Sequence, residues 1–96
     1  MIANLLTDVI AERELERNGK DAAPVVVRIG KPTPAPDVDW MCSFQIQGVG
    51  DEVVRTAYGL DAVQSLKLCL EMISADLGAL QRSYGLTWLG EDDLGF

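Results

Sequence analysis

Acidic side chains are the most obvious candidates for chemistry in this chain of 96 residues, which has 15 aspartates and glutamates, 8 lysines and arginines and no histidine. Glu91, Asp92 and Asp93 cluster near the end of the sequence, and Asp37 and Asp39 lie in a proline-rich stretch. Paired carboxylates can serve as acid and base in glycoside hydrolysis, or they can bind a hard cation. Neither group has the D-x-D-x-D-G spacing of a calcium loop. A solvated acidic tail is therefore favoured over a metal site at Asp92 and Asp93.

The absence of histidine removes several common kinds of catalytic site. A serine or cysteine triad with a histidine base cannot form, and neither can an H-E-x-x-H zinc site. The run Gly48-Val49-Gly50 is too short for a G-x-G-x-x-G phosphate loop and precedes a predicted strand, so we interpret it as a hairpin turn. We therefore expect no cofactor, and a non-enzymatic role is favoured over catalysis.

Aromatic residues and one arginine could instead line a binding pocket. The residues in question are Trp40, Arg55, Tyr58 and Trp88. Such a pocket would suit a small anionic ligand or an acidic peptide. Core packing explains the two tryptophans equally well, because large aromatic side chains contribute much of the burial in small domains. A small-molecule-binding protein, or an enzyme that uses Asp92 and Asp93 beside this pocket, is the second functional hypothesis.

The charge distribution limits the partners that the protein can have. The net charge is −7, and residues 40–96 hold 8 acidic and 3 basic residues. Such a surface repels phosphate groups, so we expect neither nucleic acid nor an anionic membrane as a partner, and a basic protein would be favoured. The simpler alternative is that the charge only keeps the protein soluble. The first ten residues include Asp8 and no basic residue, which is unlike a signal peptide, and we expect a cytoplasmic protein.

The two cysteines, Cys42 and Cys69, form no C-x-x-C motif and fall in a predicted strand and a predicted helix. Both have apolar neighbours, so buried free thiols are expected. A disulfide would require the strand and the helix to touch, and the expected cytoplasmic location argues against it.

Strand patterns fill most of the first 58 residues. Residues 1–17 are ambiguous between helix and strand, but the turn signal at 18–21 and the β-branched run at 24–29 favour a hairpin from about Val9 to Gly30, with or without a helical turn before it. Alternating prolines predict a stiff loop over 31–39. The clearest strand covers 40–47, and a turn at 48–51 leads to a fourth strand at 52–58. The side chains expected to face the core from the third strand are Trp40, Cys42, Phe44 and Ile46.

A capped helix follows from Asp61 to about Arg82. Asp61 can accept hydrogen bonds from the first helical turn, and Gln64 can reach back in capping-box fashion. The apolar stripe of this helix is Val63, Leu66, Leu70, Ile73, Leu77 and Leu80. The face expected in solvent carries Gln64, Ser65, Lys67, Glu71, Ser74, Asp76 and Ala79.

These elements predict a single α+β domain over residues 1–96. Short connections favour an antiparallel four-stranded meander with the long C-terminal helix packed on one face, in the order β-β-β-β-α. Beside the helical stripe, Leu68, Cys69 and Met72 widen the apolar surface beyond what one sheet face covers. That flank is either a dimer seam or partner groove, or it is covered by residues 88–96.

Three motifs together resemble a family of short bacterial proteins classed as a domain of unknown function. The motifs are the strand start Trp40-Met41-Cys42, the helix start Gly59-Leu60-Asp61-Ala62-Val63-Gln64-Ser65-Leu66, and the ending Trp88-Leu89-Gly90-Glu91-Asp92-Asp93-Leu94-Gly95-Phe96. The resemblance covers most of residues 9–96, and it implies that the segment from Ile10 to Glu16 is a first strand. It implies no activity, cofactor or catalytic residue.

The leading functional hypothesis is a small acidic protein-interaction module without enzymatic activity. Its candidate surface comprises Trp40, Arg55, Tyr58, Trp88, Leu68 and Met72. A structural homodimer is the third hypothesis, because the apolar flank of the helix could equally be covered by a second copy.

Overall fold

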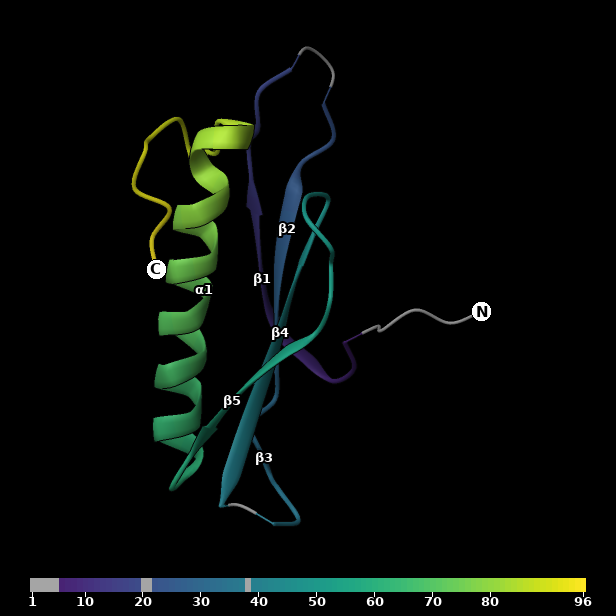
Figure 1. Cartoon of the computed structure of the whole chain (residues 1–96), viewed down its shortest axis with the longest axis vertical. Coiled ribbons are helices and arrows are strands. Elements are labelled where there is room, and N and C mark those ends of the chain that lie inside the picture. The colour runs from purple at the N-terminus through teal and green to yellow at the C-terminus, as the bar shows by residue number, and fades with distance from the viewer. Residues whose placement is uncertain (1–5, 20–21, 38) are drawn as a thin grey trace.

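Five strands and one helix make up the computed structural model, which describes residues 6–19, 22–37 and 39–96 (Figure 1). The elements are β1 (Val9–Leu15), β2 (Val25–Gly30), β3 (Thr33–Pro34), β4 (Trp40–Gln47), β5 (Arg55–Gly59) and α1 (Ala62–Tyr84). The α+β class, with strands first and one long C-terminal helix last, is as predicted. Within the ambiguous first segment, residues 9–15 form a strand, β1. The helical turn considered before it falls mostly on residues 1–5, outside the described residues.

The sheet is antiparallel throughout. β1 pairs with β2, β2 with β4, and β4 with β5. Because Phe44 pairs with both Ile29 and Arg55, β2 and β5 lie on opposite edges of β4. The order across the sheet is therefore β1-β2-β4-β5, and β3 lies beside the first residues of β4. The meander topology is confirmed, with β3 as an addition.

Two strand predictions need correction. Thr33 and Pro34 fall in the predicted loop but pair with Met41 and Trp40 as β3, which can include a proline because it is a short edge strand. The strand predicted at 52–58 begins only at Arg55. Glu52 has a φ of 56°, in the left-handed region, and this conformation interrupts the extended chain before β5.

The helix begins and ends as its capping residues require. Asp61 Oδ1 accepts a hydrogen bond from Gln64 N at 2.8 Å, and Gln64 Oε1 accepts one from Leu60 N at 2.6 Å. Gly85 ends the helix in the left-handed conformation with φ 59°, and its N–H donates to Gln81 O. The predicted start is confirmed, and α1 extends two residues beyond the predicted end at Arg82.

The buried side of α1 differs from the predicted stripe at the start of the helix. Its buried residues are Ser65, Cys69, Ile73 and Leu77. Ile73 and Leu77 confirm the prediction, but Val63 is 75% exposed, and Ser65, which we assigned to solvent, is fully buried. The cause is the close approach of the first helical turn to β5. The backbone of Gln64 and Ser65 lies against Gly59, where a Cβ atom would prevent this contact. Ser65 therefore faces the sheet in place of Val63.

Helix and tail together cover one face of the sheet. α1 packs across β4 and β5, above a core that includes Cys42, Phe44 and Ala57. After Gly85 the chain folds back on the helix side of the sheet, where Leu86 and Leu94 are buried (Figure 1). This tail lies over β1 and β2, so each half of the sheet has its own cover. The described part of the chain contains no helix that is both long enough and apolar enough to cross a bilayer.

Candidate functional site

The four residues of the predicted aromatic pocket lie in different places. Trp88 is in the tail, above Arg13 of β1, whereas Tyr58 is 55% exposed in β5 at the opposite edge of the sheet. Trp40 is half-buried at the start of β4, opposite Gly59 and Pro34. Arg55 is near none of these rings and forms an ion pair with Asp76 of α1. Neither Trp40 nor Trp88 lines any of the five best-formed depressions among the described residues.

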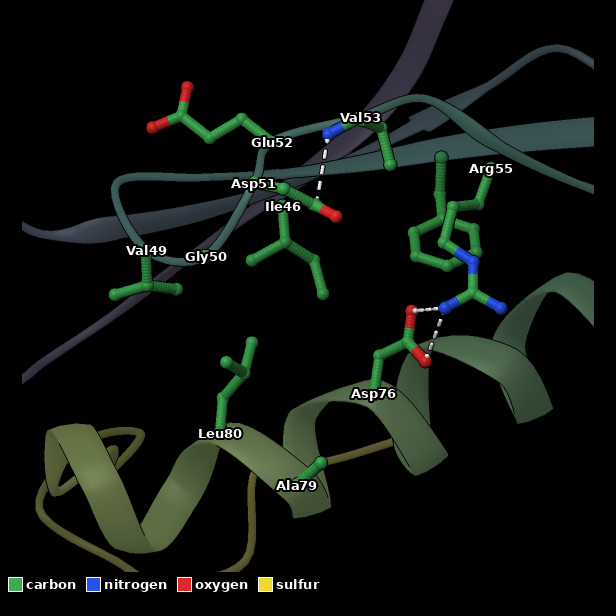
Figure 2. Close-up of a pocket in the computed structure, with 11 residues that line it drawn as sticks. Ile46, Val49, Gly50, Asp51, Glu52, Val53, Arg55, Asp76, Ala79 and Leu80 are labelled. Atoms are coloured by element: carbon green, nitrogen blue, oxygen red, sulfur yellow. Dashed lines mark hydrogen bonds and ion pairs between the residues drawn. The ribbon is translucent and has the colours of Figure 1, made fainter.

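The structure instead shows a hollow between α1 and the loop from β4 to β5, with a volume of about 470 Å³ (Figure 2). We call it the acidic hollow, and its lining residues are Phe44, Ile46, Val49, Gly50, Asp51, Glu52, Val53, Arg55, Asp76, Ala79 and Leu80. Ile46 from β4 and Leu80 from α1 point toward one another across it, and Val49 completes the apolar wall (Figure 2). This volume is within the range of sites that hold a small molecule or an anchoring side chain.

The loop keeps the hollow open through its own hydrogen bonds. Gln45 is buried beneath the loop, and its Nε2 donates to Glu52 O at 2.7 Å. The Glu52 carboxylate turns away from the hollow (Figure 2) and accepts a hydrogen bond from Gly48 N at 3.0 Å. Asp51 Oδ1 accepts from Val53 N at 3.3 Å. These hydrogen bonds fix the shape of the loop beside α1.

Charge at the rim of the acidic hollow is predominantly negative. Arg55 Nη1 donates to Asp76 Oδ1 at 3.0 Å and Oδ2 at 2.9 Å, which fixes one guanidinium against one carboxylate. Asp51 and Glu52 remain without a cation among the lining residues. Of the three carboxylates on the lining residues, that of Asp76 is paired with Arg55 and that of Glu52 points outward, so Asp51 is the unpaired charge beside the apolar floor. Such a rim favours cationic groups and disfavours anions.

A second groove lies on the same side of α1, next to β5. It has a volume of about 490 Å³ and is lined by Thr56, Ala57, Tyr58, Leu68, Glu71, Met72 and Ala75. The structure thus brings Tyr58, Leu68 and Met72 of the predicted surface together. The tail lies along the other flank of α1, beside Leu70, Ser74 and Gln81. The tail therefore does not cover the flank of Leu68 and Met72, which borders β5.

The acidic residues near the C-terminus take structural roles. Gln81 Nε2 donates to the backbone oxygen of Asp92 at 2.7 Å, and Asp93 Oδ1 accepts from Gly95 N at 2.9 Å. Among the described residues, no group of three or more acidic or cysteine side chains is arranged to hold a metal ion.

Arg13 is a structural residue that the sequence analysis missed. Its guanidinium lies 3.7 Å from the centre of the Trp88 ring and 4.8 Å from that of Phe96. Its Nη1 also donates to the backbone oxygens of Leu94 and Gly95. We call this arrangement the Arg13 clamp. The sequence could have indicated this role, because Arg13 alternates with Ala11 and Leu15 and so lies on the same face of β1 as the buried Leu15.

A second contact joins β1 to the tail. Glu16 pairs with Thr87 as an isolated bridge, and its carboxylate accepts hydrogen bonds from Thr87 Oγ1 and Gly90 N. These bonds lower the pKa of Glu16, with the Thr87 hydroxyl as the larger cause. The second half of β1 and the residue after it are thereby attached to residues 87–95.

The two thiols are free and buried at the interface of helix and sheet. Cys42 Sγ donates to Gly30 O at 3.5 Å, and Cys42 and Cys69 are close enough to interact. Burial raises the pKa of both thiols, and the neighbouring Cys42 raises that of Cys69 further. Protonated thiols are poor nucleophiles, so this pair suits packing and not catalysis.

The raised thiol pKa values predict a loss of stability at alkaline pH. In the unfolded chain the thiols ionise near their ordinary pKa of 9.0, whereas in the folded protein they keep their protons to higher pH. Above about pH 9 the unfolded state therefore binds fewer protons than the folded state. The thiols' contribution to stability is complete below that pH, and above it the contribution decreases by up to ~1.4 kcal/mol per pH unit for each thiol. Urea unfolding between about pH 8 and 10 measures this decrease. The double variant C42A/C69A should show a shallower decrease, and equal slopes would contradict the prediction.

These observations define the class of protein. It is an acidic α+β domain of two layers, in which the described surface offers apolar hollows with charged rims. The chain belongs to the family described as a domain of unknown function, DUF6968, whose model matches residues 11–96. This confirms the family-level resemblance seen in the sequence. No curated protein and no solved structure matches the chain.

Proposed function

We propose that this protein is a non-enzymatic interaction module of the bacterial cytoplasm, which binds a basic segment of another protein in the acidic hollow. The observation that carries the proposal is the combination of an apolar floor and a negative rim. Phe44, Ile46 and Leu80 supply the floor, and the lining residues Asp51, Glu52 and Asp76 carry three carboxylates against the one guanidinium of Arg55, with Glu52 on the outer side of the loop. The net charge of −7 extends the same preference to the rest of the surface.

The binding mode follows from the shape and charge of the hollow. An apolar side chain of the partner would enter between Ile46 and Leu80. A lysine or arginine beside it would lie near Asp51, and a further cation could reach Glu52 on the outer side of the loop. Burial of a large apolar side chain contributes about 1.5–3 kcal/mol. The charged rim mainly speeds association and selects cationic sequences, so binding should weaken as salt is added.

A single substitution on α1 tests the proposal. Ala79 is exposed and lines the hollow, so Ala79→Arg places a long cation there without disturbing the core. Immobilised wild-type protein should retain a basic protein from bacterial cytoplasm in near-equal amount. Ala79→Arg should weaken its binding at least about tenfold, because the added side chain fills the hollow and repels the partner's cations. Titration of the recovered partner by calorimetry gives the affinities.

Val63→Arg is the matched control, because it adds the same charge at an exposed position of the same helix, on the face away from the hollow. It should bind the partner as the wild type does. Equal binding by Ala79→Arg, or failure to recover any partner in stoichiometric amount, would count against the proposal.

A further inference from the structure

The two edges of the sheet are treated differently. At one edge, β1 carries a bulge between Val9 and Ala11, exposes Glu12 and Glu14, and is joined to the tail. Bulges, charges and covering segments are the usual means by which an edge strand is kept from pairing with another chain. β5 forms the other edge and, among the described strands, pairs with β4 alone, in an unbroken register from Phe44–Arg55 to Trp40–Gly59.

We infer that β5 pairs with β5 of a second copy of this chain, so that two sheets join into one across a two-fold axis. In an antiparallel pairing centred on Ala57, Arg55 lies opposite Gly59 of the second copy and Thr56 lies opposite Tyr58. Residues directly opposite one another in an antiparallel ladder point to the same face of the sheet. This register therefore places both helices on one face of the joined sheet and both Tyr58 side chains on the other.

The spacing of the layers fits this arrangement. Neighbouring strands lie about 4.8 Å apart, and α1 packs across β4 and β5. Each helix axis would then lie about 5 Å from the two-fold axis, which sets the two helices about 10 Å apart, close to the usual distance between packed helices. The side chains between them would be those of the groove along β5, chiefly Leu68, Met72 and Ala75.

Exposed apolar residues support a second copy as the occupant. Six large apolar side chains are exposed among the described residues, and Val53, Tyr58 and Leu60 of these lie along the segment that leads into and out of β5. In the register above, Leu60 of the second copy follows the paired strand and lies beside Val53 and Val54. Tyr58 packs over Thr56 of the second copy. A surface in which each apolar group meets another from the same patch is self-complementary, as a two-fold dimer requires.

Added salt should strengthen this dimer, whereas it should weaken binding of the proposed basic partner. Each copy carries a net charge of −7, and Glu71 lines the groove, so the two copies repel one another at long range. Added salt screens this repulsion and strengthens the dimer. The dimer interface shares Val53 and Arg55 with the edge of the acidic hollow. The inference is drawn from the edge of β5 and the groove beside it, so it does not rest on the proposed function.

Sedimentation equilibrium of the purified chain tests the inference, because the monomer mass is 10.4 kDa and the dimer has twice that mass. The wild type should dimerise. Tyr58→Lys and Ala75→Lys should each weaken association about tenfold or more, since both place a cation in a dry interface. The control Val63→Lys replaces an exposed apolar side chain on the other flank of α1 and should leave the dimer unchanged. Circular dichroism confirms that each variant is folded.

A cross-link tests the register directly. Ala57→Cys brings two thiols together on the two-fold axis, where paired Cα atoms are about 4.5–5.5 Å apart and can form a disulfide. Because Ala57 pairs with Cys42 in the sheet, both variants are made in the C42A/C69A background, where mild oxidation should yield a covalent dimer of Ala57→Cys and none of Val63→Cys. A wild type that stays monomeric at high concentration overturns the inference, as does a dimer that Tyr58→Lys and Ala75→Lys leave intact.

Discussion

Gly59→Ala is expected to destabilise the protein by about 3 kcal/mol, close to the upper end of what overpacking causes. A Cβ at this position would lie 2.5 Å from Ser65 N and 2.9 Å from the carbonyl carbon of Gln64. Both atoms belong to the helix backbone and cannot rotate away as a flexible side chain could. The first turn of α1 would have to lift from β5, which would also expose Ser65. Thermal unfolding should show a decrease in Tm of roughly 15 °C for a domain of this size.

Gly78→Ala is the matched control and should have the opposite effect. Gly78 is an exposed residue within α1, and a Cβ there would meet nothing within 4 Å. Alanine stabilises a helix interior over glycine by about 0.5–1 kcal/mol, so Tm should rise by roughly 5 °C. If the two variants shift Tm in the same direction, the close approach of α1 to β5 is not as described.

Arg13→Ala should cost about 2 kcal/mol of stability and release the C-terminal tail. The substitution removes the hydrogen bonds to Leu94 O and Gly95 O and the stacking against Trp88. Charged hydrogen bonds and cation–π contacts each contribute of the order of 1 kcal/mol at partly exposed sites. Urea unfolding measures the loss, and carboxypeptidase should remove Phe96 faster from the variant.

Two variants separate the clamp from a general effect of charge. Arg13→Lys keeps the cation but loses the planar group that stacks on Trp88, so it should recover less than half of the lost stability. Arg28→Ala removes an arginine from the neighbouring strand, where it forms a surface ion pair with Glu12, and should cost no more than about 1 kcal/mol. Equal losses for Arg13→Ala and Arg28→Ala would argue against the clamp.

Elements with local signals could be predicted from the sequence. The alternation of residues 40–47 identified β4 with its bounds, and Asp61 with Gln64 identified the start of α1. The predictions that failed depend on contacts between distant segments. Val63 follows the helical period of the stripe but is exposed, because Gly59 lets the backbone near Ser65 approach the sheet instead. Periodicity describes a helix alone and does not include the surface on which it packs.

The candidate surface was predictable in its residue types and not in its grouping. Leu68 and Met72 were identified as surplus apolar surface, and Tyr58 as an exposed aromatic, yet only the path of β5 brings them to one groove. The acidic hollow depends on the left-handed conformation of Glu52, a residue type that gives no sign of it. Trp40 and Trp88 were assigned to one candidate pocket because both are large aromatic residues, but they lie at separate places in the fold.

The Arg13 clamp also bears on the order in which the chain folds. It joins residues that are 81 and 82 positions apart, and closing a loop of that length costs about 4 kcal/mol of chain entropy before any contact is gained. The segment from β2 to α1 has much shorter loops to close and can form first. Residues 86–96 would then dock on β1 after the main folding barrier. Substitution of Arg13 is accordingly expected to speed unfolding and to leave the folding rate nearly unchanged.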